Sequence, residues 1–413
     1  MGHRYYLLLT GYLVSALGNW IYRLTLPLLV LHLTGSALHT AAVYAIEYAP
    51  FLLLSLPGGV FADRFDRRRL LVTGDLAAGV IAAVLAVIVI TGSHALWPLY
   101  LAAFLLACVE PIYHPAFHSW LPELVDEDDF AKANSWMHSV DNLTILAGPA
   151  AAGALIGLLG YNAAIVIDAA TFLFSACAIA LIRRSPATPR KPVEKSTAAP
   201  SSSMRAEIGE AARHVFKENP VLLAGSLLFT GTNLAIWIVQ ANFVYYLTAY
   251  RGFSPAVIGA VLATQGVGAL IGTAIAPRLL ARFAPGRLIL AATVGAGLAT
   301  LALIPLRSPL LIGIAGACAF AFGSVNVVSW FTFRQRIVPQ RLLGRVIAVT
   351  RMLAFASIPV AALLSGALED ALRNMYIVLA VGGLLRIAVA VAGLRTPLAR
   401  AEKRCAPTPS MSR

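Results

Sequence analysis

Residues 58–70 read GGVFADRFDRRRL, and they follow an apolar run that ends at Pro57. This short segment holds two glycines, two aspartates and four arginines. Charged side chains are costly in the hydrocarbon core of a membrane, whereas its surface accommodates them readily. If the apolar run crosses a membrane, the segment is therefore a charged loop at the end of a span.

The composition identifies the chain as an integral membrane protein. Hydrophobic residues make up 59% of its 413 residues and charged residues 12%, whereas soluble domains carry about 25% charged residues. The mean hydropathy is +0.78. Apolar runs of about 20 residues, the length of a membrane-spanning helix, predict twelve spans at residues 8–31, 40–61, 70–91, 95–113, 137–159, 163–182, 221–247, 255–276, 288–306, 310–330, 346–368 and 375–394. Because this number is even, we expect both termini on the same side.

The distribution of positive charge orients these spans. The formal net charge is +13. Arg23 and Arg386 lie within predicted spans, and only Arg251, Arg307 and Arg373 lie in the loops of one side. The other Lys and Arg residues lie on the opposite side, which the positive-inside rule identifies as cytoplasmic. We therefore expect cytoplasmic termini and basic loops that meet anionic lipid headgroups, with no nucleic-acid partner.

A polar segment divides the spans into two sets of six. Residues 184–219 are rich in Pro, Ser, Lys and Arg, which is typical of a flexible linker followed by a short amphipathic stretch. The predicted domains are a half at 1–183, the linker, a second half at 220–396 and a cytoplasmic tail at 397–413. Part of the charged loop recurs, without its acid, after the eighth span at Gly272, Pro277, Arg278 and Arg282. This weak repeat supports a duplicated six-helix unit.

The stretch GGVFADRFDRRR resembles the loop signature of the major facilitator superfamily. The segments at 114–136, 146–160, 167–176 and 334–349 are similar to its branch of macrolide-efflux and enterobactin-export proteins. The resemblance implies an all-α membrane protein with twelve transmembrane helices in two pseudo-symmetric six-helix halves. It also implies a conformational gate at the cytoplasmic loop, formed by Gly58, Asp63, Arg64, Arg68 and Asp75.

The residue types in this loop are compatible with a gate. Glycines permit close approach of a neighbouring helix. Asp63 can pair with an arginine or cap a helix N-terminus across the loop. Alternatively, the arginines at 67–69 serve only as a topology signal. Asp75, which follows on the third span, is either part of the gate or a solvated acid at a helix entry.

Ionisable side chains inside the predicted spans are candidates for the transport path. Arg23 and Glu47 fall at about the same depth, about 10 Å below the outer face at 1.5 Å per residue. They form either a structural ion pair or a pair that exchanges partners with a proton or substrate. Asp168 makes either an interhelical hydrogen bond or a substrate contact. Asp141 is either a titrating group or an acid that complements the helix dipole.

The fourth span places Glu110, His114 and His118 at positions i, i+4 and i+8, which is one face of a helix. Because Pro111 and Pro115 are expected to interrupt that helix, we expect no metal site there. Glu110 remains a candidate titrating group.

Two further groups of residues complete the candidate site. The segment containing Gly148, Pro149 and Gly153 resembles the antiporter motif of exporters in this superfamily, although ordinary small-residue packing explains it equally well. In the second half, polar and aromatic side chains are candidates to line a cavity for a bulky, partly apolar ligand, or to pack between helices. These are Asn233, Trp237, Gln240, Asn242, Gln265 and Asn326.

We therefore expect a secondary active exporter in the bacterial cytoplasmic membrane, and not an enzyme. Its substrate would be an amphiphilic small molecule such as a drug or a siderophore, exchanged for protons by a monomer. The sequence holds no phosphate-binding GxxxxGK[ST] segment, so we expect neither ATP nor another cofactor. Three alternatives stay open: a metabolite uptake permease, a membrane-embedded acyltransferase using His138 and Asp141, and a non-transporting scaffold.

Overall fold

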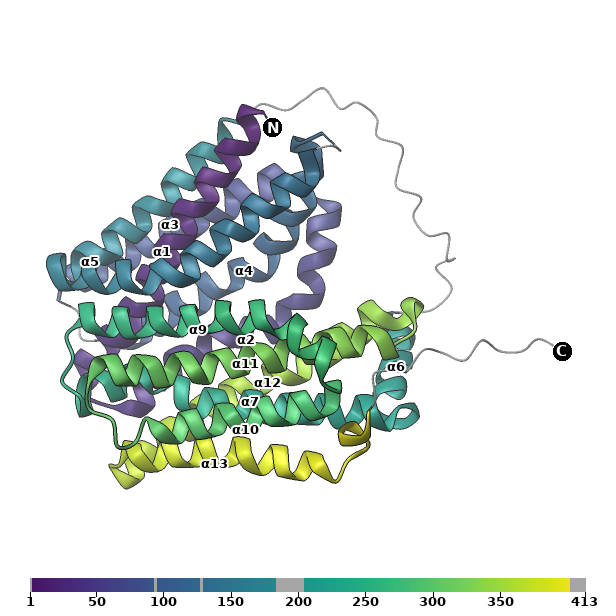
Figure 1. Cartoon of the computed structure of the whole chain (residues 1–413). Helices are drawn as coiled ribbons and strands as arrows, with labels where there is room; N and C mark the ends of the chain where they lie inside the picture. Colours follow the sequence, from purple (N-terminus) through teal and green to yellow (C-terminus); the bar gives the residue numbers. More distant parts are fainter. Residues whose placement is uncertain (1, 93–94, 127–128, 183–203, 402–413) are drawn as a thin grey trace. The chain divides into compact units, whose positions relative to one another are not determined.

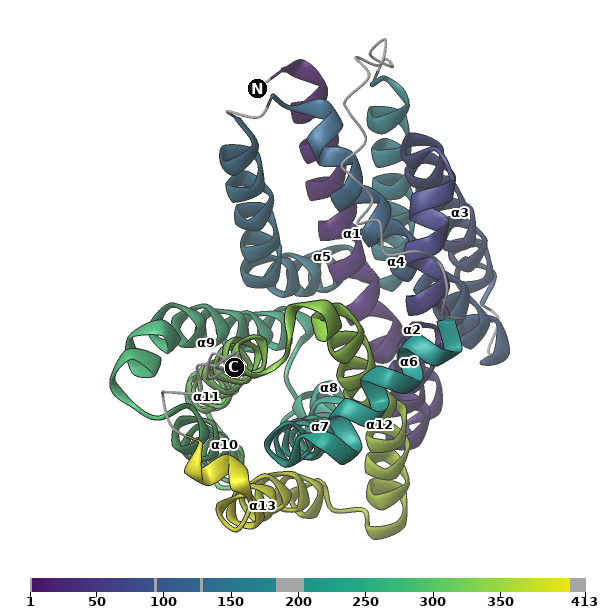
Figure 2. The ribbon, with the colours of Figure 1, turned by 90° about the vertical axis from the view of Figure 1, so that its right-hand side faces the viewer.

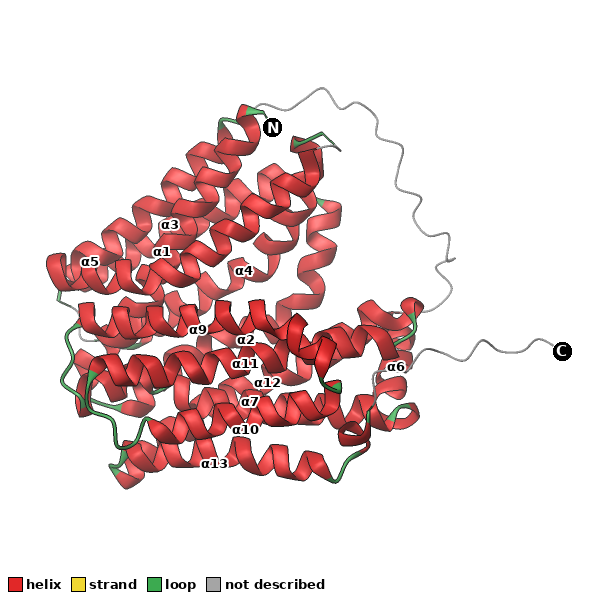
Figure 3. Cartoon of the chain, viewed as in Figure 1, coloured by secondary structure: helices red, strands yellow, loops and turns green. Residues whose placement is uncertain are grey.

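The computed structural model describes residues 2–92, 95–126, 129–182 and 204–401. Within these ranges the side chains of residues 53, 55–64, 122, 131, 204–208, 340 and 341 lie outside the description. Every element in the described residues is a helix (Figure 3). Ten of these helices are long and apolar enough to cross a membrane.

The helices reproduce the predicted spans, with two spans merged into one helix. They are α1 (His3–Thr34), α2 (Ala37–Arg64), α3 (Arg67–Ile90), α4 (Trp97–Leu124), α5 (Phe130–Ala180), α6 (Met204–Arg213), η2 (His214–Glu218), α7 (Pro220–Gln240), α8 (Phe243–Tyr245), η3 (Tyr246–Tyr250), α9 (Pro255–Arg282), α10 (Pro285–Ala302), α11 (Pro309–Ile337), α12 (Gln340–Leu372), α13 (Met375–Leu394) and η4 (Pro397–Arg400) (Figure 1). The 51-residue α5 holds both the fifth and the sixth span, and only Gly160 (φ 79°, ψ 175°) leaves helical geometry between them. Glycine adopts this positive φ without the steric cost that other residues incur.

The fourth span differs from the expectation. Helix α4 runs without a break from Trp97 to Leu124, so the predicted interruption at Pro111 and Pro115 is wrong. Proline removes one backbone donor, but a membrane-embedded helix tolerates it because neighbouring groups satisfy the freed carbonyl. Glu110, His114 and His118 therefore do lie along one continuous helix, and the rings of the two histidines stack with centroids 6.1 Å apart.

The seventh span is broken instead. Helix α7 ends at Gln240, and a turn containing Asn242 separates it from α8 and η3. The Asn242 side chain hydrogen-bonds to Ser365 Oγ of α12 at 2.8 Å. Turning its amide would add a bond from its nitrogen to Ala37 O at 3.0 Å. Hydropathy did not reveal this break, because the residues on both sides of it are apolar.

The chain divides into two compact units. Unit 1 comprises Met1–Thr188, Gln240–Gly266 and Pro359–Met375, and unit 2 comprises Pro189–Val239, Val267–Ile358 and Tyr376–Arg413. Helices α1 to α5 therefore share unit 1 with the first part of α9 and the last part of α12.

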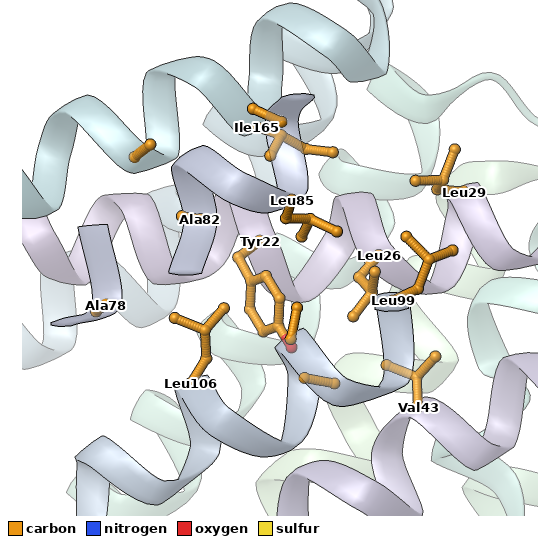
Figure 4. Close-up of a cluster of buried hydrophobic side chains, with 14 of the residues drawn as sticks. Tyr22, Leu26, Leu29, Val43, Ala78, Ala82, Leu85, Leu99, Leu106 and Ile165 are labelled. Carbon is orange, nitrogen blue, oxygen red and sulfur yellow. The ribbon is translucent and has the colours of Figure 1, made fainter. Parts of the chain in front are cut away.

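Unit 1 is held together by a cluster of interlocking aliphatic side chains. Figure 4 shows Tyr22 of α1 surrounded by Leu26, Leu85 and Leu106, which come from α1, α3 and α4. Alanines of α3 such as Ala78 and Ala82 fill the narrower spaces. Helices within a membrane associate through such close van der Waals packing, because lipid tails are as apolar as the side chains and the hydrophobic effect does not drive the helices together.

Unit 2 packs around Trp330 of α11. Its ring lies directly against Gly225 of α7, where a Cβ atom would overlap it. Gly297 of α10 and Gly383 of α13 approach each other in the same way, and Figure 2 shows α10 and α13 side by side. The amphipathic α6 follows the linker, as predicted, and Glu210 joins it to α12 through Arg345 (3.5 Å).

Candidate functional site

A cavity of about 380 Å³ lies inside unit 1 between α1, α3, α4 and α5. Trp20, Tyr113 and Phe172 supply part of its wall, together with aliphatic side chains. Its charged residues are Arg23, Asp75, Glu110 and Asp141. The cavity therefore combines aromatic surface with one cation and three carboxyl groups.

Arg23 pairs with Glu110, not with Glu47. The Nη2 atom of Arg23 lies 2.7 Å from Glu110 Oε1, and the two side chains are 40% and 26% exposed. The Arg23–Glu47 ion pair, one of our two sequence-based interpretations, is therefore wrong. Equal depth in the membrane does not decide the partner, because the face of each helix also matters. Glu47 Oε1 is buried and, among the described residues, makes no hydrogen bond.

Asp141 is held from two sides. Tyr12 donates a hydrogen bond from its hydroxyl to Asp141 Oδ1 at 2.7 Å. Nδ1 of His138 lies 3.7 Å from Asp141 Oδ2, and the His138 side chain is 73% exposed. The link to α1 is the closer one, so Asp141 belongs to the cavity wall shared by α1 and α5.

Asp75 is buried, with 2% of its surface exposed. Its Oδ2 atom accepts hydrogen bonds from Ser175 Oγ at 2.6 Å and from the Tyr113 hydroxyl at 3.3 Å. The interpretation of Asp75 as a solvated helix-entry acid is therefore wrong. It links α3, α4 and α5 across one wall of the cavity.

The charged loop ties three helix ends together. Asp66 caps α3 by accepting a hydrogen bond from Arg69 N at 2.9 Å. Arg67 forms an ion pair with Glu123 near the end of α4. Arg68 donates to the carbonyl oxygens of the last residues of α5, where a cation complements the helix dipole.

The predicted gate residues are only partly visible. The side chains of Asp63 and Arg64 lie outside the described residues, as do the surroundings of Gly58, although the backbone of all three belongs to α2. The roles of Asp66, Arg67 and Glu123 were missed. An aspartate immediately before a helix is a recognisable N-cap signal, so the sequence did contain the information for Asp66.

The segment resembling an antiporter motif is a close-packing site. Gly148 lies against the Trp20 ring, and a Cβ atom there would overlap it. A Cβ on Gly153 would lie 2.9 Å from Gly259 Cα and still closer to the Pro255 carbonyl. Small residues are therefore required where α5 meets α1 and α9.

A contact that the sequence analysis missed joins α12 to the turn between α1 and α2. Asp370 accepts hydrogen bonds from Ser36 Oγ at 2.8 Å and from Ala37 N at 3.2 Å. Ala37 is the first residue of α2, so Asp370 caps that helix from a distant part of the sequence. Gly366, one turn earlier on α12, packs against the backbone of Leu38.

The remaining candidates have different surroundings. Asn326 is 2% exposed and donates to Thr293 Oγ1 at 2.7 Å, so it packs between α11 and α10. Gln240 donates to Gln265 Oε1 at 3.2 Å. Asn233 and Trp237 are half-buried on α7. None of these residues lines the cavity of unit 1.

Comparison with known proteins identifies the family. The model of the major facilitator superfamily matches residues 8–362. The chain therefore belongs to the major facilitator superfamily, and it is a multi-pass membrane transporter and not an enzyme. This agrees with the resemblance seen in the charged loop.

Named relatives include efflux pumps. The chain is 30% identical to the multidrug efflux pump Tap of Mycolicibacterium fortuitum, over 93% of this chain and 94% of that protein. It is 24% identical to macrolide efflux protein A of Streptococcus pyogenes, over 89% of both chains. These relatives agree with the branch suggested by the sequence.

Solved structures show the same fold. A bacterial homologue of the iron transporter ferroportin, in its inward-facing state, matches 95% of this chain and 99% of its own with a TM-score of 0.73 and 17% identity. The nucleoside transporter NupG matches 95% of this chain and 98% of its own with a TM-score of 0.73 and 13% identity. At these identities the likeness shows the fold alone.

Proposed function

We propose that this protein exports an amphiphilic, drug-like small molecule from a bacterial cytoplasm in exchange for protons. The names of the efflux relatives support export of a drug-like compound. In this proposal the protein is a monomer in the cytoplasmic membrane with both termini inside, and residues 1–183 and 220–396 form the two halves that alternate access.

The observation that carries the proposal is the chemistry of the cavity. Trp20, Tyr113 and Phe172 offer flat apolar surface. Glu110, which pairs with Arg23, and Asp141, which accepts from Tyr12 and lies near His138, offer carboxylates. An amphiphile with a positive charge matches both features, because its apolar body contacts the rings and its charge meets a carboxylate. The single cation in the wall, Arg23, is already paired with Glu110.

A proton gradient is an adequate energy source for this task. One proton that moves down about 100 mV supplies about 2.3 kcal/mol. One pH unit adds about 1.4 kcal/mol. Each 1.4 kcal/mol corresponds to about tenfold, so the two terms together support a gradient of a few hundredfold for a neutral substrate. Exchange of one proton for a substrate with one positive charge moves no net charge, so there the pH difference alone supports about tenfold.

Everted membrane vesicles test this function. Vesicles from cells that express the protein should accumulate a cationic fluorescent dye when respiration acidifies their interior, and a protonophore should release the dye. Vesicles containing the Glu110→Gln variant at the same abundance should accumulate at least about tenfold less, since an amide offers no negative charge to a cationic substrate and 1.4 kcal/mol of lost interaction is about tenfold.

Two results would contradict the proposal. Accumulation only in right-side-out vesicles would instead indicate uptake. Accumulation that resists the protonophore would exclude coupling to protons.

A further inference from the structure

Arg386 is a buried cation in unit 2, near the middle of α13. Only 5% of its surface is exposed. A guanidinium stays protonated in proteins, so burial cannot neutralise it as it can neutralise an acid. A charge inside a membrane protein therefore needs a partner of opposite charge or a bound ion.

The membrane helices of unit 2 offer Arg386 no acidic partner. The sequences of α7, α9, α10, α11 and α13 contain no Asp or Glu. Within the described residues of unit 2, acids occur only in α6 and η2, where Glu210 pairs with Arg345 and Glu218 pairs with Arg213. No charged group in the described part of the chain interacts electrostatically with Arg386. Its positive charge is thus uncompensated by the protein.

The guanidinium is engaged on one side only. Nη1 lies 3.5 Å from Ala296 O and 3.4 Å from Thr300 Oγ1, both on α10. These contacts are longer than the usual N–H···O distance of about 2.9 Å. Nε is buried, and it finds no acceptor in the residues that the structure describes. The edge of the group formed by Nε and Nη2 is therefore free to donate.

This edge lies beside an open space at Gly323 of α11. A Cβ atom added to Gly323 would have one neighbour within 4 Å outside its own helix, which is Arg386 Nη2 at 3.7 Å. On α10, Gly297 makes room for the stem of the side chain, since a Cβ atom there would lie 3.2 Å from Arg386 Cβ. Figure 2 shows α10, α11 and α13 next to one another in unit 2.

We propose that Arg386 and the space beside Gly323 form a binding site for one small monovalent anion, such as chloride. Nε–H and one N–H of Nη2 point the same way from the planar guanidinium, so both can donate to one anion. One negative charge balances the charge of Arg386, whereas a divalent anion would leave an uncompensated charge in apolar surroundings.

Thr300 positions the guanidinium for this task. Its hydroxyl donates to Ala296 O at 2.9 Å, so the Thr300 oxygen is left to accept from Nη1. The two acceptors of α10 thereby hold Nη1 and leave the opposite edge for the anion.

A free anion matches this site better than a lipid phosphate does. A lipid phosphate stays in the headgroup layer, whereas Arg386 lies near the middle of α13 and is almost completely covered by protein. None of the residues of this site lines the cavity of unit 1. The anion site is therefore separate from the proposed substrate site, and it stands or falls without it.

Thermal unfolding of the purified protein in detergent tests the site. We compare potassium chloride with potassium gluconate at equal ionic strength, because gluconate is too large for the space beside Gly323. A ligand that binds only the folded state raises the unfolding temperature, by a few degrees at about 100 times its dissociation constant. The wild-type unfolding temperature should therefore rise with chloride and then level off. Bromide should act in the same way.

Arginine variants test which cation is responsible. Arg386→Gln should abolish the response to chloride, since an amide carries no charge. The matched variant Arg345→Gln removes another arginine of unit 2, one that pairs with Glu210, and should keep the response.

Glycine variants test the space itself, and they keep the test decisive if Arg386→Gln does not fold. Gly323→Ala places its Cβ atom at an ordinary 3.7 Å from Nη2, so the protein should fold. The added methyl group should weaken chloride binding by at least about tenfold. Gly344→Ala of α12 is the control, because its Cβ atom would meet nothing within 4 Å.

Three results would overturn the proposal. The first is an equal unfolding temperature of the wild-type protein in chloride and gluconate. The second is a response to chloride that persists unchanged in both Arg386→Gln and Gly323→Ala. The third is stabilisation by vesicles of an anionic phospholipid but not by chloride, which would indicate a lipid phosphate instead of a free anion.

Discussion

Arg23 interacts electrostatically with the carboxylates of Glu110 and Glu47, but it forms an ion pair only with Glu110. Glu110 accepts its hydrogen bond at 2.7 Å, while Glu47 interacts with it without forming an ion pair. A guanidinium between two acids can change partner at little cost, because each partner satisfies the same donors. A positively charged substrate at Glu110 would therefore compete with Arg23 for the same carboxylate.

The first prediction concerns this exchange. Arg23→Met should strand Glu110 without its cation, and we expect both the abundance in the membrane and export to fall. The double variant Arg23→Met with Glu110→Leu should recover abundance, because it removes the whole ion pair. It should not recover proton-coupled export. Recovery of export with normal pH dependence in vesicles would show that the pair is only structural.

Asp75 provides a second prediction at the residue scale. Its carboxyl group joins three helices by accepting from Ser175 and Tyr113. Asp75→Asn keeps an acceptor oxygen, while Asp75→Leu removes both bonds. We expect the melting temperature in detergent to fall clearly more for Asp75→Leu, with a loss of about 2–5 kcal/mol of stability. Equal melting temperatures of the two variants would show that the hydrogen bonds of Asp75 do not stabilise the packing of these three helices.

At the scale of single helices, glycine positions on α5 decide how close its neighbours approach. Gly153→Ala should be strongly destabilising, since its Cβ atom would meet backbone atoms of α9 that cannot move aside. Gly157→Ala is a matched control one turn later, where the added Cβ atom finds Ala256 Cβ at an ordinary 3.6 Å. We expect a difference of about 1–3 kcal/mol, as for overpacking in general, measured by thermal unfolding. Equal stability of the two variants would contradict the close contact.

Most helices were predictable because membrane spans follow from hydropathy alone. The apolar runs 70–91 and 375–394 located α3 (Arg67–Ile90) and α13 (Met375–Leu394) closely, whereas α1 (His3–Thr34) and α9 (Pro255–Arg282) extend further than the runs 8–31 and 255–276. The break after Gln240 was not predictable, because it depends on Asn242 bonding to a residue far away in the sequence. The continuity of α4 through Pro111 was also missed. We applied the rule that proline interrupts a helix, but a helix inside a membrane tolerates proline.

Some residues of the cavity were predictable from the sequence, but their partners were not. Charge inside a span pointed to Arg23, Glu110 and Asp141, which line one cavity, but also to Glu47 and Asp168, which do not line it. Their partners depend on helix rotation and on packing between helices that sequence spacing does not fix. Asp370 gave no signal at all, because its role as a helix cap arises from a contact with Ser36 on the other side of the linker.

The whole molecule must open and close if it is to transport, and the Asp370 cap is a contact that such a movement can break. Its partners Ser36 and Ala37 lie in the first predicted half, and Asp370 lies in the second. A cap of this kind contributes about 0.5–2 kcal/mol, which is small enough to be released in each cycle.

Crosslinking tests whether this contact separates during transport. In a background without the four native cysteines, Ser36→Cys and Asp370→Cys should join readily with a short thiol-specific crosslinker. The joined protein should stop exporting dye, and cleavage of the linker should restore export. The single variants treated in the same way are the controls. Full export by the crosslinked protein would show that these elements stay together throughout the cycle.

The central claim is that substrate and proton move in opposite directions through one protein, and simultaneous flux measurement tests it most directly. Purified protein would be placed in liposomes with a pH-sensitive dye inside and a cationic fluorescent substrate gradient as the only driving force. We predict that wild-type protein moves protons against the direction of substrate flow. Substrate flow through the wild-type protein without any proton movement would contradict the account.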